Sequence, residues 1–387
     1  MSVNCTALQS IITEKIRASD DFLSFEDFMH TALYEENLGY YESEHVFGEA
    51  GDFVTGTDLG PWLAMGFADL MVWGWQQLGR PDHWVLLEQG GGTGRLLTQV
   101  LRFLQHQEIT FPTVVAVERS AWMRDRQQKH YVEKGFGVQQ YAELSDVKTD
   151  LPVLMMCNEL PDAFPVRSFI WSDKCFYERG VQLTGDDLVW GRSQTLMSNA
   201  PNIDPMLIEA WPNDYTSEYN PALSVWQQDV STVVNNGFVF CVDYGYSQQE
   251  YYRPNRMEGT LMGHKAHQVV EDVLAKPGLC DLTAHVDFTD LAKSGIKHGL
   301  LPSSFITQGG WLAQSPMVQQ AIGELAQEGS VESMQALTHA KRMMLPFGMG
   351  ETFKLLVQCK GKQVCPDYLK GLDRLRDLRF DDEDYPK

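Results

Sequence analysis

The sequence predicts an α/β protein built on a parallel sheet that is covered by helices on both faces. Short apolar segments alternate along the chain with segments whose apolar residues keep a helical spacing. A turn with four glycines follows the first apolar segment of this alternation, and acidic residues follow later ones. Continuous apolar strands separated by helices are typical of parallel sheets that are buried on both faces.

The expected elements can be placed in chain order. Strands are expected at 83–88, 112–118, 138–144, 153–159 and 237–245, with a last one at 352–359. Helices are expected at 60–78, 95–105 and 121–132, and earlier within residues 5–35, where Ser24 and Asp27 give a helix N-cap signature. Short alternating segments between residues 169 and 193 predict an antiparallel meander, followed by a helix within 221–236.

This order predicts three regions. Residues 1–60 are expected to form N-terminal helices and a glycine- and aromatic-rich loop. Residues 61–165 and 236–387 are expected to form the core with the sheet, and residues 166–235 an inserted β-meander and helical subdomain. At about 100–200 residues per domain, 387 residues allow one large domain or two.

The composition limits the kinds of partner and cellular compartment that the sequence predicts. Lys and Arg total 31 and Asp and Glu total 52, so the formal net charge is 31 − 52 = −21, which disfavours binding to nucleic acid or anionic lipid. Solubility is one explanation of this charge, and a preference for cationic partners is the other. The seven cysteines show no CxxC spacing, so free thiols in a reducing compartment are expected. No signal-peptide pattern or apolar run of about 18 residues is visible. We therefore expect a soluble cytoplasmic protein without membrane insertion, and a homodimer stays open.

The segment WVLLEQGGGTGRLLTQVLRFL, residues 84–104, places its glycines between a strand and a helix. Glycine is needed where φ is positive or where backbone approaches a ligand closely, and the carboxyl edge of a parallel sheet is where ligands bind. A dinucleotide turn would need a third glycine at Arg95. The pattern E-x-G-x-G-x-G from Glu88 to Gly94 instead resembles the first motif of S-adenosylmethionine (SAM) methyltransferases. A purely structural turn stays open.

The second expected strand ends in Glu118, 24 residues after Gly94. An acidic side chain there can accept hydrogen bonds from both hydroxyls of a ribose. This favours an adenosine ligand without choosing among cofactors, and an exposed structural glutamate is the alternative.

The fourth expected strand is followed by Asn158, Glu159 and Asp162. If Pro161 opens a helical turn, the two carboxylates lie on one face. Neighbouring carboxylates repel unless they meet a cation or share a proton, and a guanidinium matches their geometry. They are therefore candidates for orienting an arginine, with a helix cap as the alternative.

Several segments together resemble the MidA family of SAM-dependent methyltransferases, whose mitochondrial members act in the assembly of respiratory complex I. The resemblance is carried by ALYEENLGYYES, GEAGDFVTGTDLG, LLEQGGGTGRLLTQVLR, VVAVERSAWMRDRQ, CNELPDAFPV, FVFCVDYGY and the segment EGTLMGHKAHQVVEDVLAKPGLCDLTAHVDFTDLA. It runs from about Phe28 to Ala292. Gly56, Thr57, Asp58 and Gln89 depart from the usual family pattern.

The resemblance implies a Rossmann-like class I methyltransferase sheet with helical and β-meander insertions, and SAM as the cofactor. It implies protein arginine as the acceptor, on a partner such as a respiratory-complex subunit. The residues that it assigns to cofactor binding are Asp52, Phe53, Thr55, Glu88, Gly90, Gly92, Gly94, Glu118 and Asn158. Glu159 and Asp162 are the candidates for orienting the acceptor. His285 lies between two aspartates, Asp281 and Asp287, and is a candidate proton acceptor, with a structural histidine as the alternative; no metal site is expected.

The function predicted from the sequence is therefore direct SN2 transfer of a methyl group from SAM to an arginine nitrogen. Two alternatives stay open. One is a nucleotide-dependent oxidoreductase, which Arg95 disfavours. The other is an assembly factor that binds SAM with little or no catalysis, which the presence of Glu159 and Asp162 disfavours.

Overall fold

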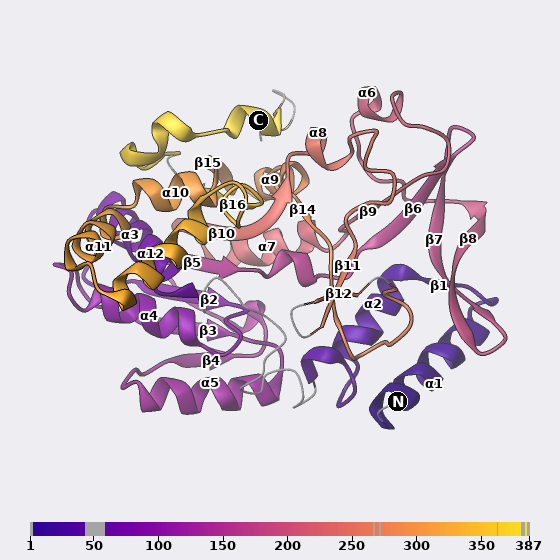
Figure 1. Cartoon of the computed structure of the whole chain (residues 1–387), viewed down its shortest axis with the longest axis horizontal. Coiled ribbons are helices and arrows are strands. Elements are labelled where there is room, and N and C mark those ends of the chain that lie inside the picture. The colour runs from indigo at the N-terminus through magenta and orange to yellow at the C-terminus, as the bar shows by residue number, and fades with distance from the viewer. Residues whose placement is uncertain are drawn as a thin grey trace. The chain divides into compact units, whose positions relative to one another are not determined.

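The computed structural model describes residues 3–42, 59–265, 268–270, 272–361, 363–380 and 384 (Figure 1). The chain divides into two compact units. We call residues 54–160, 224–245 and 288–387 the sheet unit, and residues 1–53, 161–223 and 246–287 the meander unit.

The sheet unit is organised by strands in the order β15-β16-β10-β5-β2-β3-β4 (Figure 1). Their bounds are β2 Val85–Gln89, β3 Thr113–Val117, β4 Gln139–Tyr141, β5 Val153–Asn158, β10 Gly237–Tyr246, β15 Leu301–Thr307 and β16 Phe353–Lys360. The five strands from β4 to β10 are mutually parallel, and β16 is antiparallel to both of its neighbours. The predicted α/β fold with a largely parallel sheet is confirmed.

The register of the central strands aligns their carboxyl ends. Gln89, the last residue of β2, lies opposite Val117 of β3 and Cys157 of β5. The chain therefore leaves these three strands at one edge of the sheet. The glycine turn, Glu118 and Asn158 all lie at this edge because each closely follows, or ends, one of the three strands.

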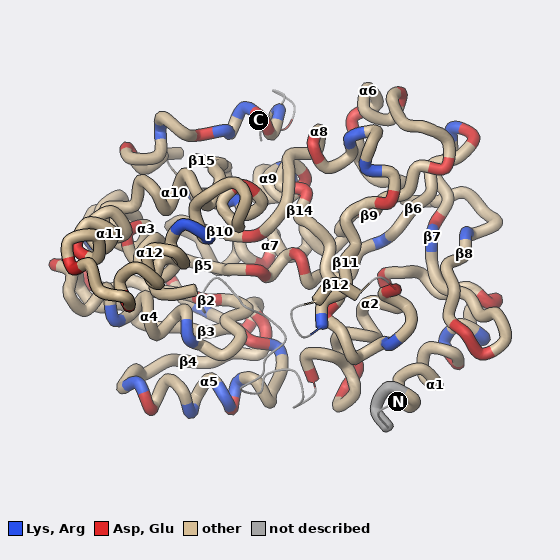
Figure 2. The backbone as a smooth tube through the Cα atoms, viewed as in Figure 1, with Lys and Arg blue, Asp and Glu red and all other residues tan. Residues whose placement is uncertain are grey.

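Helices of the sheet unit are α3 Trp62–Gln77, α4 Arg95–Leu104, α5 Ala121–Glu133, α7 Leu223–Val233, α9 Phe288–Lys297, α10 Gln308–Gln314, α11 Pro316–Glu328 and α12 Val331–Met344. Short 3₁₀ turns occur at η3 Leu144–Asp146, η5 Asp367–Leu372 and η6 Leu375–Leu378. Helix α5 carries both signs of charge along its length (Figure 2).

Two faces of the sheet are covered by different helices. Alternate strand residues, such as Leu86, Leu154 and Val357, share one buried cluster with residues of α3, α4 and α10–α12. Because successive strand residues point to opposite faces, Gln358 faces the other side, where its amide pairs with that of Gln227 in α7. Both sheet faces are therefore packed, which explains the uninterrupted apolar strands.

The meander unit contains two small antiparallel sheets. One runs β1-β7-β6-β9, with β8 also paired to β7, and the other runs β12-β11-β13. Strand bounds are β1 Leu23–Ser24, β6 Arg167–Ser172, β7 Cys175–Thr184, β8 Asp187–Leu196, β9 Tyr215–Tyr219, β11 Met262–Lys265, β12 Gln268–Val270, β13 Asp281–Thr283 and β14 Val286–Asp287. Its helical elements are α1 Val3–Ala18, α2 Phe25–Tyr34, η1 Tyr40–Glu42, η4 Pro161–Ala163, α6 Pro205–Ile208 and α8 Gln248–Tyr251.

Two features predicted from the local sequence are present in the meander unit. The Ser24 side chain accepts a hydrogen bond from the Asp27 N–H and caps α2, as the sequence predicts. The predicted meander corresponds to β6, β7 and β8. The predicted three-region boundaries stay a prediction, since compactness does not show which segments fold independently.

Two further findings concern the whole described chain. None of its helices combines the length and apolar character needed to cross a membrane. The cysteines at 157, 175, 241, 280, 359 and 365 are free thiols.

Leu86→Ala should destabilise the sheet unit by about 2–5 kcal/mol, because Leu86 is fully buried in the central strand and its removal leaves a cavity. Urea unfolding measures this. Val331→Ala, at an exposed position of α12, is the control and should change the free energy of unfolding by less than about 0.5 kcal/mol. Equal effects of the two substitutions would contradict the described core.

Candidate functional site

The glycine turn is a sequence of left-handed backbone conformations. The φ angles of Gly90, Gly92 and Gly94 are +71°, +52° and +77°. The Gly90 N–H donates to Val117 O at 3.0 Å, and the Gly94 N–H donates to Gly91 O at 2.8 Å. Side chains with a Cβ are disfavoured in this region, so the turn requires glycine at these positions before any ligand is considered.

The surroundings of the three glycines differ. A Cβ on Gly90 would lie 2.8 Å from Leu160 Cδ1, and one on Gly94 would lie 2.6 Å from Tyr131 Cε1. A Cβ on Gly92 would meet no described atom within 4 Å. The turn is therefore packed at both ends and open at Gly92, where a ligand can approach the backbone.

Glu88 lies behind the turn. It is 2% exposed, and neither carboxylate oxygen has a hydrogen-bond partner among the described residues. A Cβ on Gly91 would overlap Glu88 Oε2. Burial, and next the neighbouring Glu118 carboxylate, raises the pKa of Glu88 from 4.5 to about 8. The Glu88 carboxyl therefore holds a proton at neutral pH.

Glu118 is fixed at the edge by its backbone. Its N–H donates to Tyr141 O at 3.0 Å, and its carbonyl accepts from Arg124 Nη1 at 2.7 Å. Its Oε1 accepts from the N–H of Ser120, the N-cap of α5, at 3.1 Å. The half-buried carboxylate is thus held at the edge on which the glycine turn lies.

Glu159, which follows Asn158 at the end of β5, has a strained backbone conformation. Glu159 has φ +51°, which is uncommon for a residue with a long side chain, and its N–H donates to Val242 O at 2.9 Å. Asn158 Nδ2 donates to Glu159 Oε1 at 2.9 Å. Left-handed backbone costs about 1–2 kcal/mol in such residues and is concentrated at functional sites.

Asp162 and His285 lie in the meander unit. Asp162 is 5% exposed, and its carbonyl accepts the N–H of Ala284, the residue before His285, at 3.1 Å. The His285 N–H donates to Thr260 Oγ1 at 3.0 Å, and its ring stacks on Tyr246 with centroids 5.2 Å apart. The structure therefore brings Asp162 and the His285 segment together.

One geometric expectation was wrong. Pro161 does open a turn, but it is the 3₁₀ turn η4, which begins at Pro161. Glu159 precedes this turn and has left-handed backbone, so Glu159 and Asp162 do not share a helical face. Asp52, Phe53 and Thr55 lie outside the described residues.

Three contacts of the turn were not predicted from the sequence. Gln127 Nε2 donates to Gly92 O at 2.8 Å, Tyr131 packs against Gly94, and Trp226 Nε1 donates to Gln89 Oε1 at 3.0 Å. The available signal was the spacing of Gln127 and Tyr131, four residues apart on one face of an otherwise highly charged helix.

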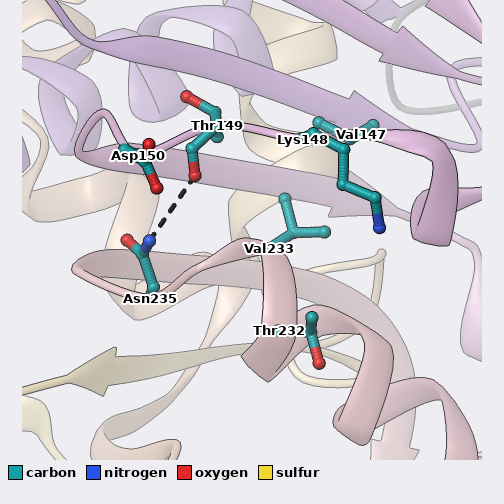
Figure 3. Close-up of a pocket in the computed structure, with 7 residues that line it drawn as sticks. All are labelled: Val147, Lys148, Thr149, Asp150, Thr232, Val233 and Asn235. Atoms are coloured by element: carbon teal, nitrogen blue, oxygen red, sulfur yellow. Dashed lines mark hydrogen bonds between the residues drawn. The ribbon is translucent and has the colours of Figure 1, made fainter.

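A pocket of about 400 Å³ lies elsewhere in the sheet unit (Figure 3). It is lined by Val147, Lys148, Thr149, Asp150, Thr232, Val233 and Asn235. These residues precede β5 and β10, so the pocket lies at the amino edge of the sheet and is distinct from the glycine turn. No group of three or more His, Cys, Asp or Glu suited to a metal ion occurs in the described part of the chain.

The sheet order, the open turn and the carboxylate after β3 define a class: Rossmann-like α/β proteins that hold a cofactor at the carboxyl edge of the sheet. The family profile described as "Putative S-adenosyl-L-methionine-dependent methyltransferase" matches residues 67–306, more than half of the chain. The chain belongs to this family of SAM-dependent methyltransferases. The family resemblance, the fold class, the cofactor and the predicted enzyme class are thereby confirmed.

Curated relatives support the same family. A Caenorhabditis elegans protein named protein arginine methyltransferase NDUFAF7 homolog, mitochondrial, is 29% identical over 310 residues, which are 73% of this chain and 70% of the relative. The Xenopus tropicalis protein arginine methyltransferase NDUFAF7, mitochondrial, is 27% identical over 325 residues, 74% of this chain and 70% of the relative.

Solved structures show the same fold. A Burkholderia thailandensis protein with S-adenosyl-homocysteine bound matches with a TM-score of 0.88 at 24% identity, over 96% of this chain and 97% of that one. A native structure from the same organism matches with a TM-score of 0.85 at 24% identity, over 96% of each chain.

The cytoplasmic location expected from the sequence is contradicted, because the curated relatives are named as mitochondrial proteins. The expectation rested on free thiols and on the N-terminal residues. Free thiols separate reducing from oxidising surroundings but do not distinguish one reducing compartment from another.

The residues at the carboxyl edge fit SAM. The open side of Gly92 leaves room for a ligand against the backbone, and the Glu118 carboxylate can accept from hydroxyl groups. When bound, SAM supplies a methyl group on a positively charged sulfur that a nucleophile can attack. The described residues leave the turn open at Gly92 and hold the Glu118 carboxylate at the same edge.

Glu88→Gln should change how stability depends on pH. Below about pH 4.5 the carboxyl is protonated in both folded and unfolded chains. As the pH rises to about 8, only the unfolded chain readily loses the proton, so the wild type loses stability. Glutamine cannot ionise, so the variant should gain up to a few kcal/mol relative to wild type between about pH 5.5 and pH 8.

Urea unfolding of the cofactor-free protein at both pH values measures this difference. The exposed Glu108→Gln provides the control and should keep the pH dependence of the wild type. Parallel curves for Glu88→Gln and wild type would show that Glu88 is not the buried acid described.

Proposed function

We propose that SAM binds at the carboxyl edge of the sheet unit, on the residues predicted from the sequence. In this proposal Gly90, Gly92 and Gly94 form the cofactor turn and Glu118 accepts the ribose hydroxyls. Glu88 supports the turn, and Asn158 lies beside the methyl donor. The family resemblance adds Asp52, Phe53 and Thr55 as candidates, which lie outside the described residues. The open side of Gly92 is the observation that carries it.

Glu118→Ala should weaken SAM binding by about 10–100-fold, because a charged hydrogen-bond acceptor contributes about 1.5–3 kcal/mol. Isothermal titration calorimetry with SAM measures the dissociation constant. Glu143→Ala, at an exposed position between β4 and β5, is the control and should leave it unchanged. Wild-type affinity in Glu118→Ala would remove this residue from the site.

We further propose that the acceptor is an arginine of a partner protein. The names of the curated relatives, protein arginine methyltransferase, support this acceptor class. The strained Glu159 supports it too, because left-handed backbone holds a carboxylate at the end of a central strand. A carboxylate accepts two parallel hydrogen bonds from a guanidinium, and the net charge of −21 favours a cationic partner.

The proposed roles follow from the chemistry of arginine. A guanidinium is always charged and its nitrogens are delocalised, so it is a weak nucleophile. Glu159 and Asp162 would orient the group and stabilise charge, which raises the rate through geometry and electrostatics. His285 would accept the proton that the nitrogen loses on methylation. On the family resemblance, we place the acceptor on a respiratory-complex subunit.

Glu159→Gln and Asp162→Asn should each lower methyl transfer by about 100-fold and leave the dissociation constant of SAM within about threefold of wild type. The assay transfers labelled methyl groups to a lysate from cells lacking this gene, and mass spectrometry then locates the modified residue. Glu209→Gln, at an exposed position after α6, controls for loss of a charge.

Modified arginine, lost in both variants, is the expected result. Methyl groups on another residue type or on a small molecule would overturn the acceptor. SAM binding by wild type without transfer to any lysate fraction would instead favour an assembly factor without turnover.

A further inference from the structure

Gln127 is a buried polar side chain that the proposed site does not use. It lies on α5, is fully buried, and donates its Nε2–H to the carbonyl of Gly92 at 2.8 Å. Its own Oε1 accepts from Gln140 Nε2 of β4 at 3.1 Å. Gln140 Nε2 also donates to Arg124 O at 3.0 Å. A chain of amides therefore connects β4 and α5 to the middle of the glycine turn.

The amide chain fixes the direction of one peptide plane. Gln140 holds Gln127 Oε1, so the opposite, donating end of the Gln127 amide faces Gly92. In a trans peptide the carbonyl of one residue and the N–H of the next point in opposite directions. Because the Gly92 carbonyl points towards α5, the Thr93 N–H points away from α5.

The Thr93 N–H is not used by the turn itself. The backbone hydrogen bonds that close the turn come from the N–H groups of Gly90 and Gly94. Thr93 is half-buried, and the neighbouring Gly92 is the position where the described atoms leave room. A backbone N–H held outward beside the start of α4 suits a negatively charged or acceptor group, because the helix start adds positive potential.

Tyr131 limits the freedom of the same turn from the other side. Its ring edge lies against Gly94, one turn of α5 beyond Gln127. Gly92 is thus held by a hydrogen bond and Gly94 by packing, both from α5. Thr93 lies between these two glycines. The direction of its N–H is therefore determined by α5 and not by the ligand.

We propose that Gln127 is a positioning residue for the cofactor: it turns the Gly92–Thr93 peptide so that the Thr93 N–H can bind the carboxylate of the amino-acid portion of SAM. This inference rests on the proposal that the glycine turn holds the cofactor. It goes further in two ways. It assigns the carboxylate of SAM to the Thr93 N–H, and it gives a role to Gln127, which does not touch the ligand.

The test compares two ligands by calorimetry. S-adenosylhomocysteine carries the amino-acid portion, and 5′-methylthioadenosine lacks it. Gln127→Met, which keeps the side-chain length but removes the amide, should weaken S-adenosylhomocysteine about tenfold and 5′-methylthioadenosine less than about threefold. A general loosening of the fold would weaken both ligands equally, so equal weakening or unchanged binding of both would overturn the inference.

Two further variants sharpen the test. Gln308→Met removes another buried amide that donates to a backbone carbonyl, that of Met343 at 3.0 Å, and should leave both ligands unaffected. Gln140→Met removes the hydrogen bonds of Gln140 to Gln127 and to Arg124 O but leaves the one from Gln127 to Gly92, so it should give a smaller shift of the same selectivity. It replaces Gln127→Met if that variant fails to fold, and an unchanged ratio of the two affinities would then count against the inference.

A separate variant tests the proposal that the glycine turn holds the cofactor. Gly92→Val should abolish binding of both ligands if the turn holds the cofactor. If Gly92→Val binds both normally, the proposed cofactor site is wrong. If it abolishes binding while Gln127→Met leaves the ratio of affinities unchanged, only the role of Gln127 is wrong.

Discussion

The parallel register of β2 with β3 and β5 is the constraint on which the other features of the site depend. It ends three neighbouring strands level with one another, so that three short sequence motifs meet at one edge. None of these motifs alone identifies a cofactor site. A glycine turn, a glutamate and an Asn-Glu pair gain chemical meaning because backbone hydrogen bonds between the strands place them side by side.

The sequence was sufficient for β2, β3, β5 and β10, whose apolar residues are nearly uninterrupted, and for the Ser24 cap, because local chemistry determines them. It was not sufficient for β15, where a proline and two serines interrupt the apolar pattern of LPSSFIT. That strand exists because β16 pairs with it and its residues are buried on the sheet. Tertiary pairing overrides weak local preference there.

Part of the candidate site was also predictable from the sequence. Glycines with positive φ and an acidic strand end can be recognised from residue type and spacing. Gln127 could not, because its partner, the Gly92 carbonyl, is backbone and lies 35 residues earlier in the chain. The left-handed Glu159 was also unforeseen, since glutamate has no intrinsic preference for that conformation and the hydrogen bond that its N–H donates to Val242 O is a tertiary contact.

The two units are interleaved along the chain. The chain passes from one unit to the other after residues 53, 160, 223, 245 and 287. Neither unit therefore corresponds to a contiguous gene fragment, and a single cut between residues 54 and 287 divides both units. Recombination that exchanges a terminal segment between relatives cannot transfer one whole unit without part of the other. The interleaving therefore couples the inheritance of the meander unit to that of the sheet unit.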